Sequence, residues 1–530
     1  MMIKRLLILL IAVPLLLVAV PCWGANVYID PTWGGTESGT FAEPYNSWAD
    51  VTITAGNDYR QKCGTTETVT AMSITADGTS ENHIIIGAYY DDSGVVHEDT
   101  SPNFGQLCGN SDQKPILKQT NVGALPPEDN IFQSTDMNYV EFNSLQLKDA
   151  SEAIEIHGNN NIVRYCYIYH TRYGVRIGLL ATADFNIVEY NFIDLADDVN
   201  EDGTGNDAIA LQFYADTNTI QYNHITGFDH GGIQINGGDN NIIQYNYLYE
   251  SSSDNSEDFC LGHNYSASGN IERYNFCNGA GQGVEILGGQ SNEIYGNLLV
   301  CDDEADAPNE NQACIDLITS DALVAGGWDS DDNLIYNNTV YYRGAISGVY
   351  GLKMVTGSHA SCETTTIQGN YVVNNVFLNS TGEVFRLIDN CGSSTLSNNY
   401  FYNNIGYGFE AGSYGVYLGT NKADADAWNS ASANHTGNLD TDPSLSNPAT
   451  GAFWPDSSSD PVVGTGYTLG PPYNQLIVPG GTTDFTATPP VVNLETQSPN
   501  NIGAYKSSDA GPVAPTYPLQ GVKLEGAKYN

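Results

Sequence analysis

The chain has 530 residues and a formal net charge of −44 at pH 7, because 62 Asp and Glu residues stand against 18 Lys and Arg residues. A surface this acidic repels nucleic-acid phosphates and anionic lipid headgroups, which argues against nucleic acid and anionic membranes as partners. It also disfavours an anionic polysaccharide as a ligand, unless divalent cations bridge the two.

Residues 1–25 have the pattern of a secretory signal peptide. Lys4 and Arg5 precede the apolar run LLILLIAVPLLLVAV, and small residues suited to cleavage follow near Gly24 and Ala25. The apolar run is shorter than a comfortable membrane span. We therefore expect a secreted protein, extracellular or periplasmic, with no membrane insertion.

Nine of the ten cysteines follow residue 25, and an oxidising compartment permits them to form disulfides. The odd number leaves at least one thiol free, and no CxxC or Cys/His metal spacing occurs. The pairs expected across loops are Cys63 with Cys108, Cys301 with Cys314, and Cys362 with Cys391.

A short phrase returns along the chain, as in NIVEYNFID, NTIQYNHIT and NIIQYNYLY, always with an Asn in the same place. The spacing of these Asn residues varies above a minimum of about 22 residues, which is typical of a fixed structural turn decorated by loops. Cys166 takes the same position one turn earlier. The aligned series is Asn191, Asn223, Asn246, Asn275, Asn297, Asn338, Asn370 and Asn399.

A unit of about 22 residues built from short β-strands cannot bury an apolar face alone. Stacking solves this, because each turn lays its strands on the preceding turn, about 4.8 Å away, and apolar side chains pile up inside. At the bend between strands, we expect the repeated Asn to adopt left-handed backbone angles. Its side-chain amide is expected to bond to the Asn of the next turn.

Several phrases resemble the pectate-lyase-like superfamily of secreted right-handed parallel β-helix proteins, including VYIDPTWGGTESGTFAEPYNSWADV at 27–51 and SPNNIGAYK at 498–506. The resemblance implies an all-β, right-handed parallel β-helix with N- and C-terminal caps. The expected organisation is a signal peptide at 1–25, a cap with first strands at 26–75, the β-helix at 76–410, C-terminal coils and a cap at 411–506, and a tail at 507–530.

A second strand in each turn alternates inward apolar and outward side chains, as in GVEI at 283–286, where Val284 and Ile286 point inward and Glu285 outward. Stacking the turns in register predicts one outward column of side chains along a flank of the helix. Its expected members are Glu155, Arg176, Ala210, Gln234, Cys260, Glu285, Asp316 and Lys353.

Three acidic residues, Asp258, Glu285 and Asp316, come from consecutive turns, so their carboxylates are expected within one or two strand spacings. Carboxylates this close raise one another's pKa or recruit a cation. Lys353 follows on the next turn, and the structural alternative is a cross-strand ion pair without a catalytic role.

Pectate lyases of the superfamily that this chain resembles use calcium held by acidic side chains and an Arg or Lys base. The resemblance implies that Asp258, Glu285 and Asp316 hold calcium while Lys353 takes the C5 proton of a uronide. Glu285 and Asp316 are also candidate catalytic residues, because two carboxylates can act as acid and base in glycoside hydrolysis. The candidate substrate-binding residues are Arg176, Gln234 and Arg273.

A second candidate calcium site is DVNEDGTGND at 198–207. Asp198, Asn200 and Asp202, followed by a glycine, match the first half of a calcium loop, and Asp207 could complete the ligand shell. Position twelve is Ile209 instead of Glu, so the segment is no EF-hand. The structural alternative is an acidic surface loop.

Two functions from different classes fit these patterns. The first is an exported carbohydrate-active protein that grips an extended extracellular polysaccharide along one flank, as a calcium-assisted lyase acting on an acidic polysaccharide. The second is a non-catalytic surface, adhesive or polysaccharide-binding module. In both cases we expect a monomer. The acidic column with its lysine favours the first, whereas the scarcity of basic residues and of complete catalytic motifs favours the second.

Overall fold

The fold is seen in a computed structural model. The residues it describes are 24–100, 106–119, 130–134, 136–195, 207–228, 230–250, 259–302, 313–319, 328–343, 349–356, 365–378, 382–390, 396–409, 412–447, 452–455, 460–463, 466, 475–477, 491–496 and 503–504. Residues 1–23 and 505–530 fall outside these ranges, as do the segments 198–206 and 251–258 that contain predicted calcium ligands.

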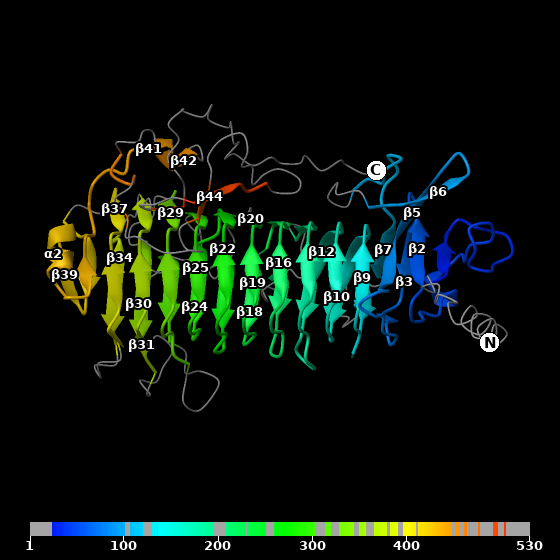
Figure 1. Cartoon of the computed structure of the whole chain (residues 1–530), viewed down its shortest axis with the longest axis horizontal. Coiled ribbons are helices and arrows are strands. Elements are labelled where there is room, and N and C mark those ends of the chain that lie inside the picture. Colours follow the sequence, from blue (N-terminus) through cyan, green and yellow to red (C-terminus); the bar gives the residue numbers. More distant parts are fainter. Residues whose placement is uncertain are drawn as a thin grey trace, which may run out of the picture.

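The chain winds into an elongated stack in which strands of successive turns pair side by side (Figure 1). One long sheet, called the first sheet here, collects one strand from each turn. Its members are β1 (Asn26–Ile29), β2 (Asp58–Lys62), β5 (Ile84–Asp92), β9 (Val140–Asn143), β11 (Ile162–Arg164), β13 (Ile187–Glu189), β16 (Thr219–Gln221), β19 (Ile242–Gln244), β22 (Ile271–Arg273), β25 (Glu293–Tyr295), β28 (Leu334–Tyr336), β32 (Tyr371–Val373), β36 (Tyr400–Tyr402) and β40 (His435–Thr436), with β6 (Val95–Glu98) antiparallel to β5.

Two further rows of strands complete each turn, and the long strands β10 (Gln146–Ile156) and β12 (Tyr167–Ile177) belong to both. The second row contains β3 (Thr66–Val69), β7 (Ile116–Gln119), β14 (Phe192–Asp194), β17 (His224–Thr226), β20 (Tyr247–Tyr249), β23 (Phe276–Asn278), β26 (Leu298–Cys301), β29 (Thr339–Tyr342), β33 (Val376–Leu378) and β37 (Ile405–Tyr407). The third row contains β4 (Met72–Ser73), β8 (Phe132–Gln133), β15 (Asp207–Leu211), β18 (Gly231–Asn236), β21 (Phe259–Asn264), β24 (Gln282–Leu287), β27 (Ala313–Ile318), β30 (Tyr350–Thr356), β34 (Phe385–Asp389) and β38 (Gly415–Tyr417).

Turn-to-turn pairings within the three rows are parallel and in register, so the parallel β-helix predicted from the repeats is confirmed. At the C-terminal end of the third row, β39 (Thr420–Lys422) pairs antiparallel with β38 and precedes the short helix α2 (Ala425–Asn429). Smaller elements are η2 (Trp48–Asp50), the parallel pair β31 (Ile367–Gln368) and β35 (Leu396–Ser397), and the antiparallel pairs β41 (Leu445–Asn447) with β42 (Ala452–Pro455) and β43 (Gln475–Ile477) with β44 (Leu494–Thr496).

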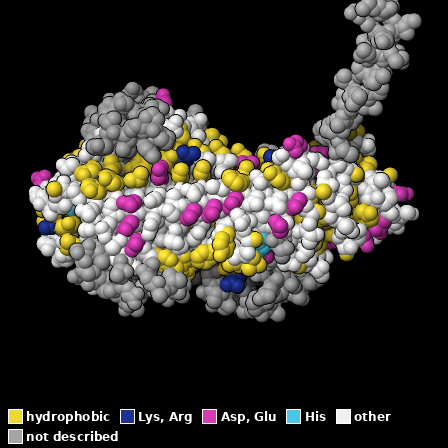
Figure 2. Space-filling view, turned by 60° about the horizontal axis from the view of Figure 1, so that its bottom comes forward, with side chains coloured by type: hydrophobic (Ala, Val, Ile, Leu, Met, Phe, Trp, Pro, Cys, Tyr) yellow, Lys and Arg dark blue, Asp and Glu magenta, His cyan; other side chains and the backbone are white. Residues whose placement is uncertain are grey.

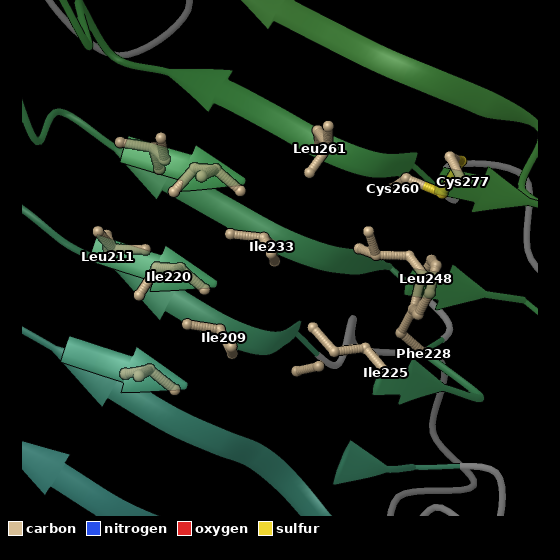
Figure 3. Close-up of a cluster of buried hydrophobic side chains, with 14 of the residues drawn as sticks. Ile209, Leu211, Ile220, Ile225, Phe228, Ile233, Leu248, Cys260, Leu261 and Cys277 are labelled. Atoms are coloured by element: carbon tan, nitrogen blue, oxygen red, sulfur yellow. A yellow bond between two sulfur atoms is a disulfide. The ribbon is translucent and has the colours of Figure 1, made fainter. Parts of the chain in front are cut away.

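The interior is filled by columns of apolar side chains, one from each turn. Ile209, Ile233 and Leu261 lie in register on β15, β18 and β21 and are fully buried (Figure 3). Because each turn covers the apolar face of its neighbour, burial that a single turn cannot achieve is shared along the whole stack.

Two buried asparagine ladders run along the stack, although the repeats predicted only one. In each ladder, one Asn side chain accepts hydrogen bonds from the backbone and the side chain of the Asn one turn earlier, as Asn275 does from Asn246 at 3.0 Å. The ladder between the first sheet and the second row contains Asn191, Asn223, Asn246, Asn275, Asn297, Asn338, Asn375, Asn404 and Asn438. The other ladder, five residues earlier in each turn, contains Asn161, Asn186, Asn218, Asn241, Asn270, Asn292, Asn333, Asn370 and Asn399.

The predicted series was therefore right up to Asn338 and wrong for Asn370 and Asn399, which belong to the other ladder. The position of Cys166 in the series is confirmed, because its backbone N–H donates to Asn191 Oδ1 at 3.0 Å. The left-handed backbone angle was predicted for the ladder Asn itself, which is one residue too late in the sequence. It belongs to the residue before each ladder Asn, such as Tyr274 with φ of 56°. The ladder Asn supplies the amide, and its predecessor makes the bend.

Asn275→Ala is expected to lower the free energy of unfolding by about 3 kcal/mol or more, because it strands several buried hydrogen-bonding groups at once. Asn246 loses its acceptor, while Asn297 Oδ1 and the Ile243 carbonyl lose donors. Urea unfolding measures the effect. The exposed Asn421→Ala is the control, with an expected change within about 0.5 kcal/mol. Equal midpoints for the two variants would contradict an energetic role for the ladder.

Disulfides join Cys63 to Cys108 and Cys301 to Cys314, as predicted. A third, between Cys260 and Cys277, was not predicted and lies inside the core, where it links β21 to β23 (Figure 3). Cys166 is a free, buried thiol. The predicted pair Cys362–Cys391 lies outside the described residues.

The C-terminal stretch packs against the outside of the helix. Figure 1 shows β41, β42 and β44 lying along its upper side, over the middle and C-terminal turns. Phe453, Ile477 and Ala504 are buried against outward aromatic residues that include Tyr274 and Phe276. This stretch therefore covers apolar side chains that the stack leaves on its outer surface. Within the described residues, no helix is long and apolar enough to cross a membrane.

Candidate functional site

The predicted column of outward side chains lies on the outer face of the third row. Glu285 on β24, Asp316 on β27 and Lys353 on β30 are directly in register, which confirms their predicted alignment. The neighbours of Asp316 on either side, Ile315 and Leu317, belong to the apolar core, so Asp316 itself points outward. Three side chains separated by more than thirty residues each in sequence thus become neighbours.

Asp316 and Lys353 form a buried ion pair. Lys353 Nζ lies 2.5 Å from Asp316 Oδ2, with Asp316 fully buried and the Lys353 side chain only 9% exposed. An ion pair removed from water in this way is costly to break from one side, because the remaining charge has no compensation. We therefore expect the Asp316–Lys353 pair to hold both side chains in place on the outer face of the third row.

Asp316, as placed, does not fit a calcium ligand. The Lys353 ammonium already occupies its carboxylate, and a divalent ion bound at the same oxygen would stand beside a positive charge. No group of three or more His, Cys, Asp or Glu side chains in the described ranges could hold a metal ion. Asp258, Asp198, Asn200 and Asp202 lie outside those ranges, so their predicted role as ligands stays a prediction.

Asp207, the remaining predicted calcium ligand, lies on β15 near the N-terminal end of the face. Its Oδ1 is 2.8 Å from His230 Nδ1, and the carboxylate is nearly buried. In register, Asp207 stands opposite Gly231 of β18, three residues before the column that holds Glu285 and Asp316. The structure does not bring Asp207 together with those two carboxylates.

The column continues one turn beyond the prediction, to Arg386 on β34, which is in register with Lys353. The Arg386 guanidinium lies 4.5 Å from the ring centroid of Tyr350, donates to the Tyr350 hydroxyl, and pairs with Glu383 at 3.5 Å. Arg386 could have been predicted from the sequence, because FRLID at 385–389 continues the alternation of inward and outward side chains by one turn.

Cys260 does not belong to the column. Gly262 takes its place, in register between Gln234 and Glu285, whereas Cys260 points into the core and is bonded to Cys277. The strict alternation of inward and outward side chains fails here, because Cys260 and Leu261 are both buried in the core. The predicted column was wrong at this one position.

The three predicted substrate-binding residues are not brought together. Gln234 occupies the middle of the column, where its Oε1 accepts from Asn236 Nδ2 at 2.6 Å. Arg176 lies near the N-terminal end of the column, beside Glu152 and Glu155. Arg273 lies on β22 of the first sheet, away from the column, where it donates to Gln244 and Tyr295 at 2.8 Å.

Acidic side chains outnumber basic ones on the face of the molecule seen in Figure 2. Figure 2 shows them spread along the length of one flank, with Lys and Arg side chains at few points. Two basic side chains on adjacent strands, Lys353 and Arg386, are therefore a concentration of positive charge that the composition alone makes unusual. The arrangement can hold a sugar carboxylate against the guanidinium and offers an amine nearby.

The chain matches no known family description and no curated protein sequence. Among solved structures, it is similar to pectate lyase Pel9A, at 12% identity over 91% of this chain and 96% of that one, with a TM-score of 0.44. A lacto-N-biosidase from Eubacterium ramulus matches at 14% identity, over 65% and 67% of the two chains, with a TM-score of 0.41. An alginate lyase from Paenibacillus matches at 14% identity, over 65% and 94%, with a TM-score of 0.38.

At these identities the likeness concerns the fold alone. The strand pairings of the chain itself establish its parallel β-helix architecture. The resemblance recognised from the repeats and terminal phrases is thus confirmed at the level of the fold: the chain is a parallel β-helix protein.

Proposed function

We propose that this chain is an exported carbohydrate-active protein that binds an extended acidic polysaccharide along the outer face of the third row and cleaves it as a lyase. The observation that carries the proposal is the in-register column of Glu285, Asp316, Lys353 and Arg386. Solved structures with similar folds include proteins described as pectate and alginate lyases, which is consistent with a uronide substrate.

In the proposed reaction, the Arg386 guanidinium binds the carboxylate of a uronate residue, which makes the C5 proton more acidic. A proton passed from the Lys353 ammonium to the buried Asp316 carboxylate leaves a neutral amine that can take the C5 proton. The C5–H electrons form the C4–C5 double bond, the C4–O bond breaks, and the departing oxygen takes up a proton from solvent.

Calcium belongs to the proposal only through predicted ligands outside the described residues, and no step is assigned to it. A divalent ion bound by the segment 198–207 or by Asp258 would reduce the repulsion between an acidic chain and an acidic glycan. We therefore expect a chelator to weaken the binding of uronides.

The assay incubates the purified chain with pectate, alginate and other uronides, with calcium or with a chelator. Absorbance in the ultraviolet reports the unsaturated ends that β-elimination creates. The proposal predicts a signal with at least one uronide and its loss in Lys353→Ala. The absence of a signal with every uronide would overturn the lyase activity, whereas a signal that survives in Lys353→Ala would overturn the assignment of the base.

One observation favours the alternative of a non-catalytic binding module. Lys353 and Arg386 already have acidic partners, as basic residues on a purely structural surface would: Lys353 pairs across strands with Asp316, and Arg386 pairs with Glu383 three residues earlier in the chain. Retention of the protein on a uronide matrix without release of unsaturated ends or reducing sugar would identify this second function.

A further inference from the structure

A second polar cluster lies on the outer face of the third row, near its N-terminal end. Arg176 on β12 bridges two carboxylates of β10, with its Nη2 2.6 Å from Glu152 Oε1 and 2.8 Å from Glu155 Oε1. Both glutamates are more than nine-tenths buried. The cluster therefore brings two acidic side chains and one basic side chain together in a largely buried position.

The two carboxylates have different surroundings. Glu155 is well satisfied, because His157 Nε2 lies 2.9 Å from its Oε1 and Asn130 Nδ2 donates to its Oε2 at 2.6 Å. Glu152 Oε2, in contrast, is buried and has no hydrogen-bond partner among the described residues. A buried polar oxygen without a partner is costly, so this atom marks a position where a ligand or water is expected.

Unpartnered donors lie in the same cluster. The Nε atoms of Arg172 and Arg176 are buried, and neither has a hydrogen-bond partner within the part of the chain that the structure describes. The guanidinium groups of Arg172 and Arg176 lie 5.3 and 5.6 Å from the centroid of the Tyr173 ring, and all three residues belong to β12. Two guanidinium groups beside a half-buried ring are a suitable setting for a planar anion.

The electrostatics separate the two acids. Burial raises the pKa of Glu152 to about 7, and the negative charge of Glu155 adds to this rise, which the nearby Arg176 and Arg172 guanidinium groups offset only in part. Burial also raises the pKa of Glu155, but hydrogen bonds from His157 and Arg176 outweigh it and hold that pKa below its ordinary value. Around neutral pH, one acid therefore stays charged while the other is half protonated.

We propose that Arg172, Arg176 and Glu152 form a second binding site, for the carboxylate of a uronate sugar, in which the Glu152 carboxyl donates a hydrogen bond to the bound anion. With Glu152 protonated, two guanidinium groups face one charged carboxylate, that of Glu155. The other titratable side chains nearby are His157, directly after β10, and Asp207 on β15, which lies close to Tyr173. This site rests on the proposed polysaccharide ligand and extends its path.

The second site and the Lys353 column lie on one continuous face. Glu155 and Glu285 belong to the same register line, through Arg176, Ala210, Gln234 and Gly262. Five strand spacings of about 4.8 Å separate them, or about 24 Å along the helix axis. An extended oligosaccharide of several residues would reach from one site to the other.

The test measures binding of oligogalacturonate and oligomannuronate by calorimetry at pH 6 and pH 8. Binding that requires protonated Glu152 weakens about tenfold between these values in the wild type, since the apparent affinity scales with the competent fraction. Glu152→Gln keeps a hydrogen-bond donor at both pH values, so its affinity is expected to stay level. Arg172→Gln is expected to weaken binding about tenfold, while Lys148→Gln on β10 is the matched control with unchanged affinity.

A neutral oligosaccharide of equal length should show none of these changes. Wild-type affinity that is equal at pH 6 and pH 8, or a Glu152→Gln variant that loses affinity as the wild type does, would overturn the site. So would wild-type affinity in Arg172→Gln. Because this test measures binding, its result is independent of the lyase assay. If unsaturated ends are released but binding does not depend on Arg172, only the second site is overturned. If binding depends on Arg172 but no cleavage occurs, only the lyase activity is overturned.

Discussion

Lys353→Met is expected to lower the free energy of unfolding by about 3–5 kcal/mol, because it leaves the fully buried Asp316 carboxylate without its counter-charge. The double variant Asp316→Leu/Lys353→Met removes both charges and is expected to recover most of that loss. Both variants are expected to lack lyase activity. If the double variant regains stability but stays inactive, the structural role of the ion pair is separated from its proposed chemical role.

Urea unfolding of the two variants and the wild type provides the measurement. Lys62→Met is the matched control, since Lys62 also pairs with an aspartate, Asp30, at 2.8 Å but keeps 39% of its side chain exposed. Because Lys62 is partly exposed and Asp30 keeps its hydrogen bonds from Thr32, the loss of this pair is expected to cost less stability than the loss of the Asp316–Lys353 pair. A Lys353→Met variant no less stable than Lys62→Met would show that the Asp316–Lys353 pair is open to solvent.

Removing one partner of a buried His–Glu contact inside the helix is expected to have an effect of similar size. His263 on β21 and Glu272 on β22 are both fully buried and point into the core, with His263 Nε2 2.7 Å from Glu272 Oε1. His263→Ile leaves a carboxylate buried in apolar surroundings and is expected to lower the free energy of unfolding by about 3–5 kcal/mol.

The double variant His263→Ile/Glu272→Ile is expected to be as stable as the wild type or more so, by up to about 4 kcal/mol. The neighbouring turns already place Ile235 and Ile286 at the position of His263, and Ile243 and Ile294 at that of Glu272. The isoleucines therefore form two interior columns, and each column would be completed by one further isoleucine, at position 263 or 272. A double variant less stable than His263→Ile alone would contradict this interpretation of the pair.

The regular part of the fold could be predicted because every turn repeats the same local problem. A ladder Asn satisfies the buried backbone at each corner, and this leaves a signal in the sequence at every turn. The confusion of the two ladders has a simple origin. Each turn carries two Asn residues five positions apart, and in IQGNYVVNN both Asn370 and Asn375 follow a strand of similar composition.

The site was predictable wherever the strand alternates regularly. Glu285, Asp316 and Lys353 follow that rule and were found. Where the chain turns into the third row, two consecutive residues face the core instead, as Ala153 and Ile154 do. That break places Glu152 and Glu155 on the same outer face although they are three residues apart, which a period of two does not foresee.

Partners of the site residues could not be foreseen from the sequence. Lys353 pairs with Asp316, and Arg176 pairs with Glu152 and Glu155. These pairings depend on the side-chain conformations across neighbouring strands, which the sequence does not specify. The pKa of Glu152 is raised by burial and depends on the charges of Glu155 on β10 and of Arg172 and Arg176 on β12, which only the fold brings close. Sequence spacing gives the neighbours along a column, and three-dimensional packing decides their chemistry.

The central claim is that an acidic polysaccharide lies along the outer face of the third row. A crystal structure of the full chain with a bound oligouronide tests it most directly. The proposed function predicts sugar rings running parallel to the helix axis, with a carboxylate within hydrogen-bonding distance of Arg386 and another at Arg172 or Arg176. An oligosaccharide seated on the first sheet, or on the outside of the second row, would contradict it.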